Sequence, residues 1–321
     1  MTSLRSVDDL LAVVPYLLGF HPADSAVVLG VRDDRIIFQA RGDLPAPADV
    51  PRLARYYADL VARQHPTGAL VVGYGDGAAV TPIVCALSAA MDARGIRLLD
   101  AVRVADGRYW SYVCTDPACC PPEGRSYDPQ TNPVALAAIV DGSIALPSRE
   151  ALERRLAPVD GPARAAMDEA TRRANDRLSE LLDTGPRDLR RTLLRTGSAA
   201  VDAAVRCHRG GGRLTDDEVA WLAVVLLHLA VRDYAWESVG GDLGVHVGLW
   251  TEVVRRCDPE LAAAPATLLS FAAWRAGEGA VASIALSRAL AADPGYPMAL
   301  LMSRALAGGL NPADWEAAAR T

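Results

Sequence analysis

The chain contains no lysine, and all 33 of its basic residues are arginine. A lysine Schiff base is therefore impossible, which excludes pyridoxal phosphate enzymes and class I aldolases. The phosphate-loop lysine and the Ser-x-x-Lys dyad are excluded for the same reason. There is also no Gly-x-Ser-x-Gly elbow and no His-Glu-x-x-His helix. The commonest serine hydrolases and zinc metalloproteases therefore have no support in the sequence.

Long hydrophobic runs are missing as well. The longest apolar stretch, residues 221–231, is interrupted by His228 and is too short to span a bilayer. Asp8 and Asp9 precede a short apolar run that Pro15 interrupts, which is unlike a secretory signal. We therefore expect a cytoplasmic protein with reduced thiols and no membrane partner. The net charge of −6 and the scattered arginines give no concentrated basic face, so we expect no nucleic-acid partner.

The first 145 residues are predicted to form an α/β domain, a sandwich around a mixed sheet. Helical periodicity covers residues 6–18, 51–64 and 81–94, and strand patterns cover 27–31, 35–41, 69–74, 96–105 and 109–113. The dipeptides Asp33-Asp34 and Asp106-Gly107 separate neighbouring strands and predict hairpins. A chain of 321 residues has room for a second domain.

Strand patterns end near residue 148, and the remainder is predicted to be helical. Residues 146–185 are highly charged and are interpreted as a helical connector, followed by an all-α domain of helical hairpins over 186–321. Thr215-x-x-Glu218 is a capping box that predicts a helix reaching about residue 233. Further helices are predicted over residues 246–257, 260–276, 280–292 and 296–306.

One helical pair resembles the tetratricopeptide repeat. The matching residues are Leu269, Gly277, Ala282, Leu286, Ala289, Leu290 and Pro294. Gly277 permits a tight turn, the two alanines allow close helix packing, and Pro294 ends the hairpin. Repeats of this kind form concave surfaces that bind extended peptides, so the resemblance implies a protein or peptide partner.

The opening segment VPYLLGFHPADSAVVLG, residues 14–30, points to a wider resemblance. Together with Arg41-x-Asp43-Leu44-Pro45 and the later cysteine cluster, it is similar to an actinobacterial family of unassigned function. Members of that family resemble the chain over nearly its whole length. The resemblance implies a cytoplasmic setting but no activity.

The segment CTDPACCPPEG concentrates unusual chemistry, since Cys114, Cys119 and Cys120 fall within seven positions. Thiols at this density suit a metal site, a redox pair or a nucleophile, and the alternative is a structural loop. If a cofactor binds, zinc is the first candidate, with His21, His65 or Asp116 as fourth ligand. The Cys-x₄-Cys-Cys spacing itself is not an established zinc pattern.

The prolines that follow the cluster stiffen its backbone. Pro121 and Pro122 come directly after Cys120. We therefore expect an ordered loop that packs on the α/β domain, with Cys114 as its buried anchor on the preceding strand.

Two further groups are candidates for catalysis. His21 and Asp24 could form an acid/base pair beside Ser25, or could serve only to shape the loop between a helix and a strand. Arg41 and Asp43 could clamp a ligand carboxylate or pair with each other. The segment at residues 73–77 is interpreted as a plain glycine-rich loop, because the dinucleotide pattern is incomplete.

Two functions remain open from the sequence. The first is an interaction or regulatory protein with a sensor-like α/β domain and a helical docking domain. The alternative is an enzyme whose site lies between the His21 and Asp24 loop, Arg41 with Asp43, and the Cys114 loop, with zinc as its candidate cofactor.

Overall fold

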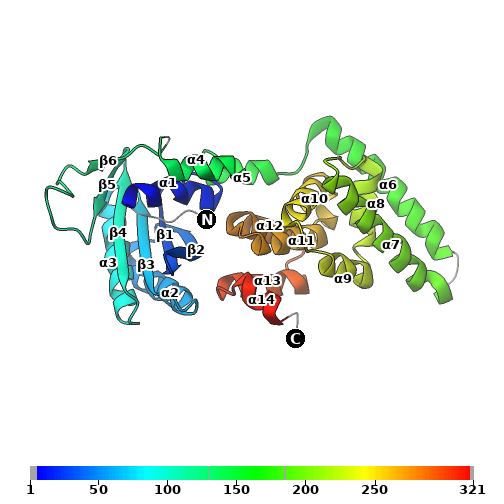
Figure 1. Ribbon diagram of the computed structural model, residues 1–321. Coiled ribbons are helices and arrows are strands. Elements are labelled where there is room, and N and C mark those ends of the chain that lie inside the picture. Colours follow the sequence, from blue (N-terminus) through cyan, green and yellow to red (C-terminus); the bar gives the residue numbers. More distant parts are fainter. Residues whose placement is uncertain (1–5, 130, 184–185, 319–321) are drawn as a thin grey trace. The chain divides into compact units, whose positions relative to one another are not determined.

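The structure, a computed structural model, describes residues 6–129, 131–183 and 186–318, with the backbone alone for 186–188 and 316–318. The chain forms two compact units (Figure 1). The first comprises Met1–Ala151 and Gly308–Thr321 and holds the strands, and the second, Leu152–Ala307, is helical. The predicted boundary at residue 185 lies outside the described residues.

A six-stranded sheet with the order β2-β1-β3-β4-β5-β6 forms the centre of the first unit. The strands are β1 (Ser25–Arg32), β2 (Arg35–Asp43), β3 (Gly68–Tyr74), β4 (Leu98–Ala105), β5 (Arg108–Ser111) and β6 (Arg125–Ser126). β3 and β4 pair in parallel and all other neighbours are antiparallel. The predicted mixed sheet is confirmed, with β6 as a short strand that has no clear signal in the sequence.

Both predicted hairpin turns form. Asp33 and Asp34 have φ angles of 50° and 56°, and Asp106 and Gly107 have 50° and 70°. Two consecutive left-handed residues give a turn whose twist matches that of the flanking strands. These turns set the register of β1 with β2 and of β4 with β5.

Helices cover both faces of the sheet (Figure 1). α2 (Val50–Ala62) and α3 (Gly77–Asp92) pack on one face around Val28, Val71 and Ala101. α1 (Val7–Leu18) and α4 (Pro133–Val140) lie against the other face and contact each other. Because both faces are covered, β1 is buried along nearly its whole length instead of alternating. The unit is therefore a three-layer sandwich.

Local capping fixes where the helices next to the sheet begin and end. The Ser6 side chain accepts a hydrogen bond from the amide of Asp9, and Gly19 ends α1 with φ of 79°. α3 begins earlier than the sequence predicts, because Asp76 Oδ1 accepts from the amides of Ala78 and Ala79 at 2.8 and 3.1 Å. This cap brings the start of α3 to the end of β3.

The second unit is built from helices. They are α6 (Gly161–Asp183), α7 (Pro186–Arg209), α8 (Asp216–Val225), α9 (Leu229–Glu237), α10 (Leu243–Arg256), α11 (Ala263–Arg275), α12 (Gly279–Ala292) and α13 (Pro297–Ala307), with α5 (Arg149–Leu156) entering it. Short 3₁₀ turns lie at Pro47–Asp49 and Pro259–Leu261. α6, which the sequence assigns to a connector, belongs to this unit through its packing on α8.

The predicted helix from Thr215 to about residue 233 is wrong in one respect. Its capping box forms, with Thr215 Oγ1 accepting from Glu218 N and the Glu218 carboxylate accepting from Thr215 N. However, the helix breaks after Val225, and α9 continues at an angle of 110°. Among the described residues, no single helix is long and apolar enough to cross a membrane. Taken together, α8 and α9 have the length and composition of a membrane span, but the bend separates them.

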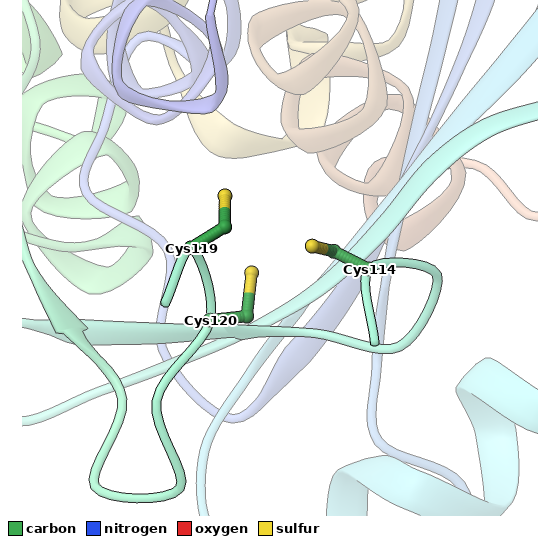
Figure 2. A group of neighbouring side chains, drawn as sticks. All are labelled: Cys114, Cys119 and Cys120. Carbon is green, nitrogen blue, oxygen red and sulfur yellow. The ribbon is translucent and has the colours of Figure 1, made fainter. Parts of the chain in front are cut away.

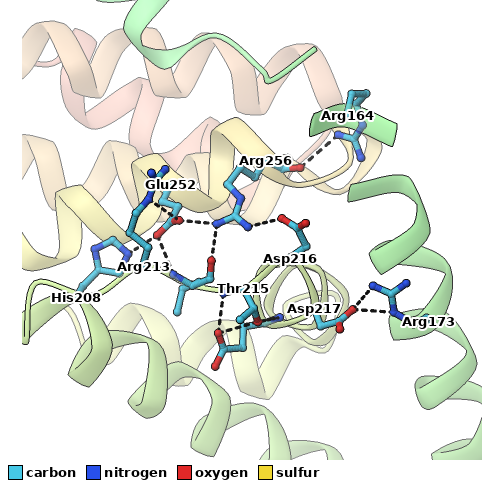
Figure 3. A network of polar contacts seen from close by, with 11 residues as sticks. Arg164, Arg173, His208, Arg213, Thr215, Asp216, Asp217, Glu252 and Arg256 are labelled. Carbon is cyan, nitrogen blue, oxygen red and sulfur yellow. Dashed lines mark hydrogen bonds and ion pairs between the residues drawn. The ribbon is translucent and has the colours of Figure 1, made fainter. Parts of the chain in front are cut away.

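A polar network joins α7, α8 and α10 (Figure 3). Glu252, only 9% exposed, accepts hydrogen bonds from His208 Nε2 at 2.7 Å and from an Arg256 guanidinium nitrogen at 2.5 Å. Arg256 also pairs with Asp216 at 2.5 Å. Such a network compensates the burial of the Glu252 charge.

The chain returns to the α/β unit after α13. Gln64, just past α2, donates to Gly309 O at 2.7 Å, and Asn311 donates to Gln64 Oε1 at 3.3 Å. Arg63 donates to Gly308 O at 2.9 Å. α14 (Pro312–Ala318) therefore belongs to the first unit, whereas the sequence interpretation places residues 186–321 together in the helical domain.

Candidate functional site

Three thiols converge beyond the end of β5. The sulfur atoms of Cys114, Cys119 and Cys120 all lie within 4.8 Å of one another (Figure 2). The residues come from the two sides of one loop, which turns back between Cys114 and Cys119. All six cysteines of the chain are described, and all are free thiols. The arrangement gives three soft ligands in one place, which is what a thiophilic metal ion requires.

A turn around Asp116 positions two of the thiols. The Asp116 carboxylate accepts a hydrogen bond from Ala118 N at 2.9 Å. The backbone carbonyl of Asp116 accepts hydrogen bonds from Cys119 N at 3.1 Å and from Cys120 N at 2.7 Å. Asp is well suited to this role because its side chain mimics a backbone turn. Both cysteines are therefore held on one turn of backbone that faces Cys114.

Cys114 is held from the other side by Ser111, the last residue of β5. Ser111 Oγ accepts from Val113 N at 3.1 Å and Cys114 N at 2.9 Å, and donates to Asp100 Oδ1 at 2.9 Å. Cys114 is partly exposed and lies past the end of the strand. The sequence-based expectation of a buried Cys114 on a strand is therefore wrong, because the strand ends three residues earlier.

The rest of the loop is anchored on Trp110. The indole Nε1 donates to Pro122 O at 3.0 Å, and Arg108 donates to Gly124 O at 2.7 Å. Gly124 has φ of 79°, and a Cβ atom there would lie 2.4 Å from the Trp110 ring. Only glycine fits this contact, so the backbone of the loop packs flat on the indole.

The three thiols differ in acidity. A hydrogen bond from the backbone of Asp116, together with one from Cys120, lowers the pKa of Cys114. Burial raises the pKa of Cys120 to about 12, and its hydrogen bonds to the other two thiols act in the same direction. Cys114 is therefore the first of this pair to ionise. A bound cation would favour the thiolate form of the whole group.

The fourth ligand that the sequence suggests is not part of the group. Within the portion of the chain that the structure describes, the cluster contains the three cysteines and no histidine or carboxylate. His21, His65 and Asp116 therefore do not complete a tetrahedral set in this structure. A metal ion held here would take its fourth ligand from outside the cluster.

A separate cavity of 610 Å³ lies at the end of the sheet where β3 and β4 finish. Its walls come from α1, the loop before β1, the residues after β3 and the β4–β5 turn. Crevices at the carboxyl ends of parallel strands are the usual ligand sites of α/β sheets. None of the three clustered cysteines lines it.

The predicted catalytic residues divide between this cavity and its surroundings. His21 and Asp24 line the cavity, and Asp24 has a left-handed backbone with φ of 41°. Arg41 and Asp43 do not line it, and they form an ion pair at 2.5 Å. The cavity thus brings His21 and Asp24 together without the other predicted residues.

Sequence reasoning did not mark Arg103 or Trp110, and it interpreted residues 73–77, of which Tyr74, Gly75 and Asp76 line the cavity, as a plain glycine-rich loop. The Arg103 guanidinium lies 3.6 Å from the ring centre of Trp110, and Tyr74, 7% exposed, has a buried hydroxyl without a hydrogen-bond partner in the part of the chain that the structure describes. Burial raises the pKa of Tyr74 well above its ordinary value, so the hydroxyl stays protonated. Strand periodicity places these residues in the sheet but does not reveal that they meet at one end of it.

The family of the chain follows from a comparison with family models. The model described as "Domain of unknown function (DUF4192)" matches residues 8–313. The chain belongs to this family. The DUF4192 match contains both the thiol cluster and the cavity, and it agrees with the expected resemblance to a family of unassigned function. No curated protein and no solved structure matches the chain.

Proposed function

We propose that this protein is a zinc-binding regulatory protein whose α/β unit holds one zinc ion through Cys114, Cys119 and Cys120. The observation that carries the proposal is the approach of the three sulfur atoms to within 4.8 Å of one another. Ligands of a tetrahedral zinc with bonds of about 2.3 Å lie about 3.8 Å apart, so small side-chain movements would complete the site. Zinc is redox-inert and binds thiolates tightly, which suits the cytoplasm.

An exchangeable fourth ligand is the basis of the regulatory role. Structural zinc sites use four protein ligands, whereas sites with three keep one position for water or another molecule. Cys119 is exposed, and Cys114 and Cys120 are partly exposed, so such a ligand could reach the ion from solvent. The α/β unit would thereby act as the sensor.

The helical unit is proposed to dock a protein or peptide partner. Its tetratricopeptide-like segment supports this role, because α11 and α12 pack as a hairpin with Gly277 in the turn at φ of 80°. Ala282 and Ala289 are fully buried, which is consistent with close helix packing. The two activities would be linked if zinc loading changes partner binding.

A zinc-dependent enzyme is the second candidate. It is favoured by the cavity, which holds His21 and Asp24 as possible acid/base groups. It is weakened by the Arg41–Asp43 ion pair, which already occupies the groups that would clamp a substrate. The thiols also lie outside the cavity lining, so an enzyme would need movement to use zinc and His21 together.

The zinc content of the protein tests the first candidate. Full-length protein purified without a histidine tag is expected to contain about one equivalent of zinc, given how tightly structural zinc is held. Cys119→Ser should lower the zinc content to below about a tenth of an equivalent, because the two remaining thiolates hold zinc poorly. Cys85→Ser is the matched control, since Cys85 is an exposed thiol on α3 outside the cluster. Equal zinc contents in both variants would contradict the proposal.

The same preparations test the link to a partner. Zinc-loaded protein, chelated protein and Cys119→Ser are used as bait for a native lysate. A regulatory role predicts at least one protein that is retained reproducibly and whose retention differs between loaded and chelated bait. If no partner is retained reproducibly, or if the same partners are retained by loaded and chelated bait, the regulatory role is contradicted. The measured zinc content would still support the zinc site.

A further inference from the structure

The cavity at the ends of β3 and β4 is surrounded by charged side chains that do not pair with one another. Arg103 is half-buried and stacks on Trp110, and within the described chain it has no carboxylate partner. Asp24 and Asp76 line the same cavity, and neither forms an ion pair among the described residues. Opposite charges that face one cavity without neutralising each other are available to a ligand that carries both.

We propose that this cavity binds a free α-amino acid. The ligand carboxylate would pair with the Arg103 guanidinium, which lies over the Trp110 ring and makes no hydrogen bond or ion pair among the described residues. The ligand ammonium would lie between the carboxylates of Asp24 and Asp76. Arg103 offers a positive partner and Asp24, Asp76 and Asp106 offer negative ones, so the lining contains a partner for each of the two charged groups of a zwitterion.

The start of α3 argues against a simple anion as the ligand. A helix N-terminus attracts anions through its free amides. Here the amides of Ala78 and Ala79 are already bonded to Asp76, so they are not free to bind one. A phosphate would also lie close to the Asp24 and Asp76 carboxylates, which would repel it. An ammonium group on the ligand removes this conflict.

The inner wall of the cavity indicates what the ligand side chain meets. Leu11 and Pro15 from α1 supply an apolar surface, and Tyr127 adds an aromatic ring. Tyr74 belongs to the same lining, and its buried hydroxyl has no hydrogen-bond partner among the described residues. Buried hydroxyls are normally paired, so this one is expected to bond a polar atom of the bound molecule. A side chain with an apolar stem and a polar end fits this wall.

Calorimetric titration of the full-length protein with each standard amino acid tests the proposal. At least one should bind with 1:1 stoichiometry and a Kd of about 1 mM or lower. The binding amino acid is then compared with its decarboxylated amine and its N-acetyl derivative. Each should bind about tenfold or more weakly, because each lacks one of the two charged groups. Absence of binding by every standard amino acid would overturn the proposal, as would equal binding of either derivative.

Charge-neutral variants locate the binding site. Arg103→Gln and Asp24→Asn should each weaken binding about tenfold or more, since each removes one charged contact. Asn tolerates the left-handed backbone of Asp24, so Asp24→Asn should fold and still tests the site if Arg103→Gln fails to fold. The controls are Arg97→Gln and Asp92→Asn, which change exposed charges outside the cavity.

The outcomes separate the amino-acid site from the zinc site. Binding should persist in Cys119→Ser, because none of the clustered cysteines lines the cavity. Unchanged affinity in both Arg103→Gln and Asp24→Asn would place the ligand elsewhere and overturn the proposal. Inorganic phosphate that binds as tightly as the amino acid would also overturn it, in favour of a simple anion site.

Discussion

Gly124 is the residue on which the shape of the thiol loop depends most directly. Its φ of 79° lies in the left-handed region, and the Trp110 ring occupies the space that a side chain would need. Pro122 and Gly124 are both tied to β5 by hydrogen bonds from Trp110 and Arg108. The loop that carries Cys119 and Cys120 is therefore fixed by its packing on one indole.

Gly124→Ala is predicted to weaken zinc binding as well as stability. A Cβ at 2.4 Å from the ring must displace either the loop or Trp110. Gly107→Ala is the matched control, because Gly107 has φ of 70° but open space around its Cα. Both variants should lose about 1–2 kcal/mol from the left-handed backbone. Only Gly124→Ala should also lose zinc affinity in a chelator competition, and equal zinc affinities would contradict the role of the Trp110 contact.

The sequence is informative about single residues where their chemistry is rare. Three cysteines within seven positions predict a thiol site, and the structure brings those three sulfurs together. Arg103 could not be predicted in the same way, since it is one arginine among 33 and its meeting with Trp110 depends on strand register. Of the fourth-ligand candidates, His21 and His65 lie on other loops, whose approach no spacing rule predicts, and the Asp116 carboxylate accepts the Ala118 amide within its own turn instead.

At the scale of helices and strands, local signals predict most elements and fail where tertiary packing decides. The capping box at Thr215 and the hairpin turns at Asp33-Asp34 and Asp106-Gly107 are contacts between near neighbours, so the sequence reveals them. The break between α8 and α9 has no proline or glycine to mark it. A continuous apolar pattern is compatible with one helix or with two buried ones.

In the polar network of Figure 3, Glu252 links α10 to His208 of α7, and Arg256 links α10 to Asp216 of α8. Burial alone would raise the pKa of Glu252, but hydrogen bonds from His208 and the Leu214 amide, with the charge of Arg256, hold it below its usual value of 4.5. A carboxyl with a depressed pKa stabilises the fold above its unfolded-state pKa. That contribution is lost as pH falls through the folded-state pKa.

Glu252→Gln is predicted to destabilise the protein by about 3 kcal/mol near neutral pH, because it breaks a buried charged pair. The difference from wild type should begin to shrink as pH falls below 4.5, where the unfolded chain takes up the proton, and should vanish below the lower folded-state pKa, where the native carboxyl is protonated too. Denaturant unfolding at several pH values measures this. Glu260→Gln is the control, since Glu260 is exposed and should change stability little. A difference that stays constant down to acidic pH would contradict the assigned role of Glu252.

At the scale of the whole chain, the sequence predicts an α/β part followed by helices, and the structure agrees at that level. The return of Gly308–Thr321 to the α/β unit was not predicted. It rests on contacts such as Gln64 with Gly309, which join residues more than two hundred positions apart. Helical periodicity says nothing about such pairings, so domain membership of a terminal segment requires the structure.

The central claim is a zinc ion held by three thiolates and one exchangeable ligand. X-ray absorption at the zinc edge of the tag-free, full-length protein tests it most directly, because it reports the ligand atoms themselves. The account predicts three sulfur ligands at about 2.3 Å and one nitrogen or oxygen ligand at about 2.0–2.2 Å. A first shell of nitrogen and oxygen alone, or zinc below about a tenth of an equivalent, would contradict it.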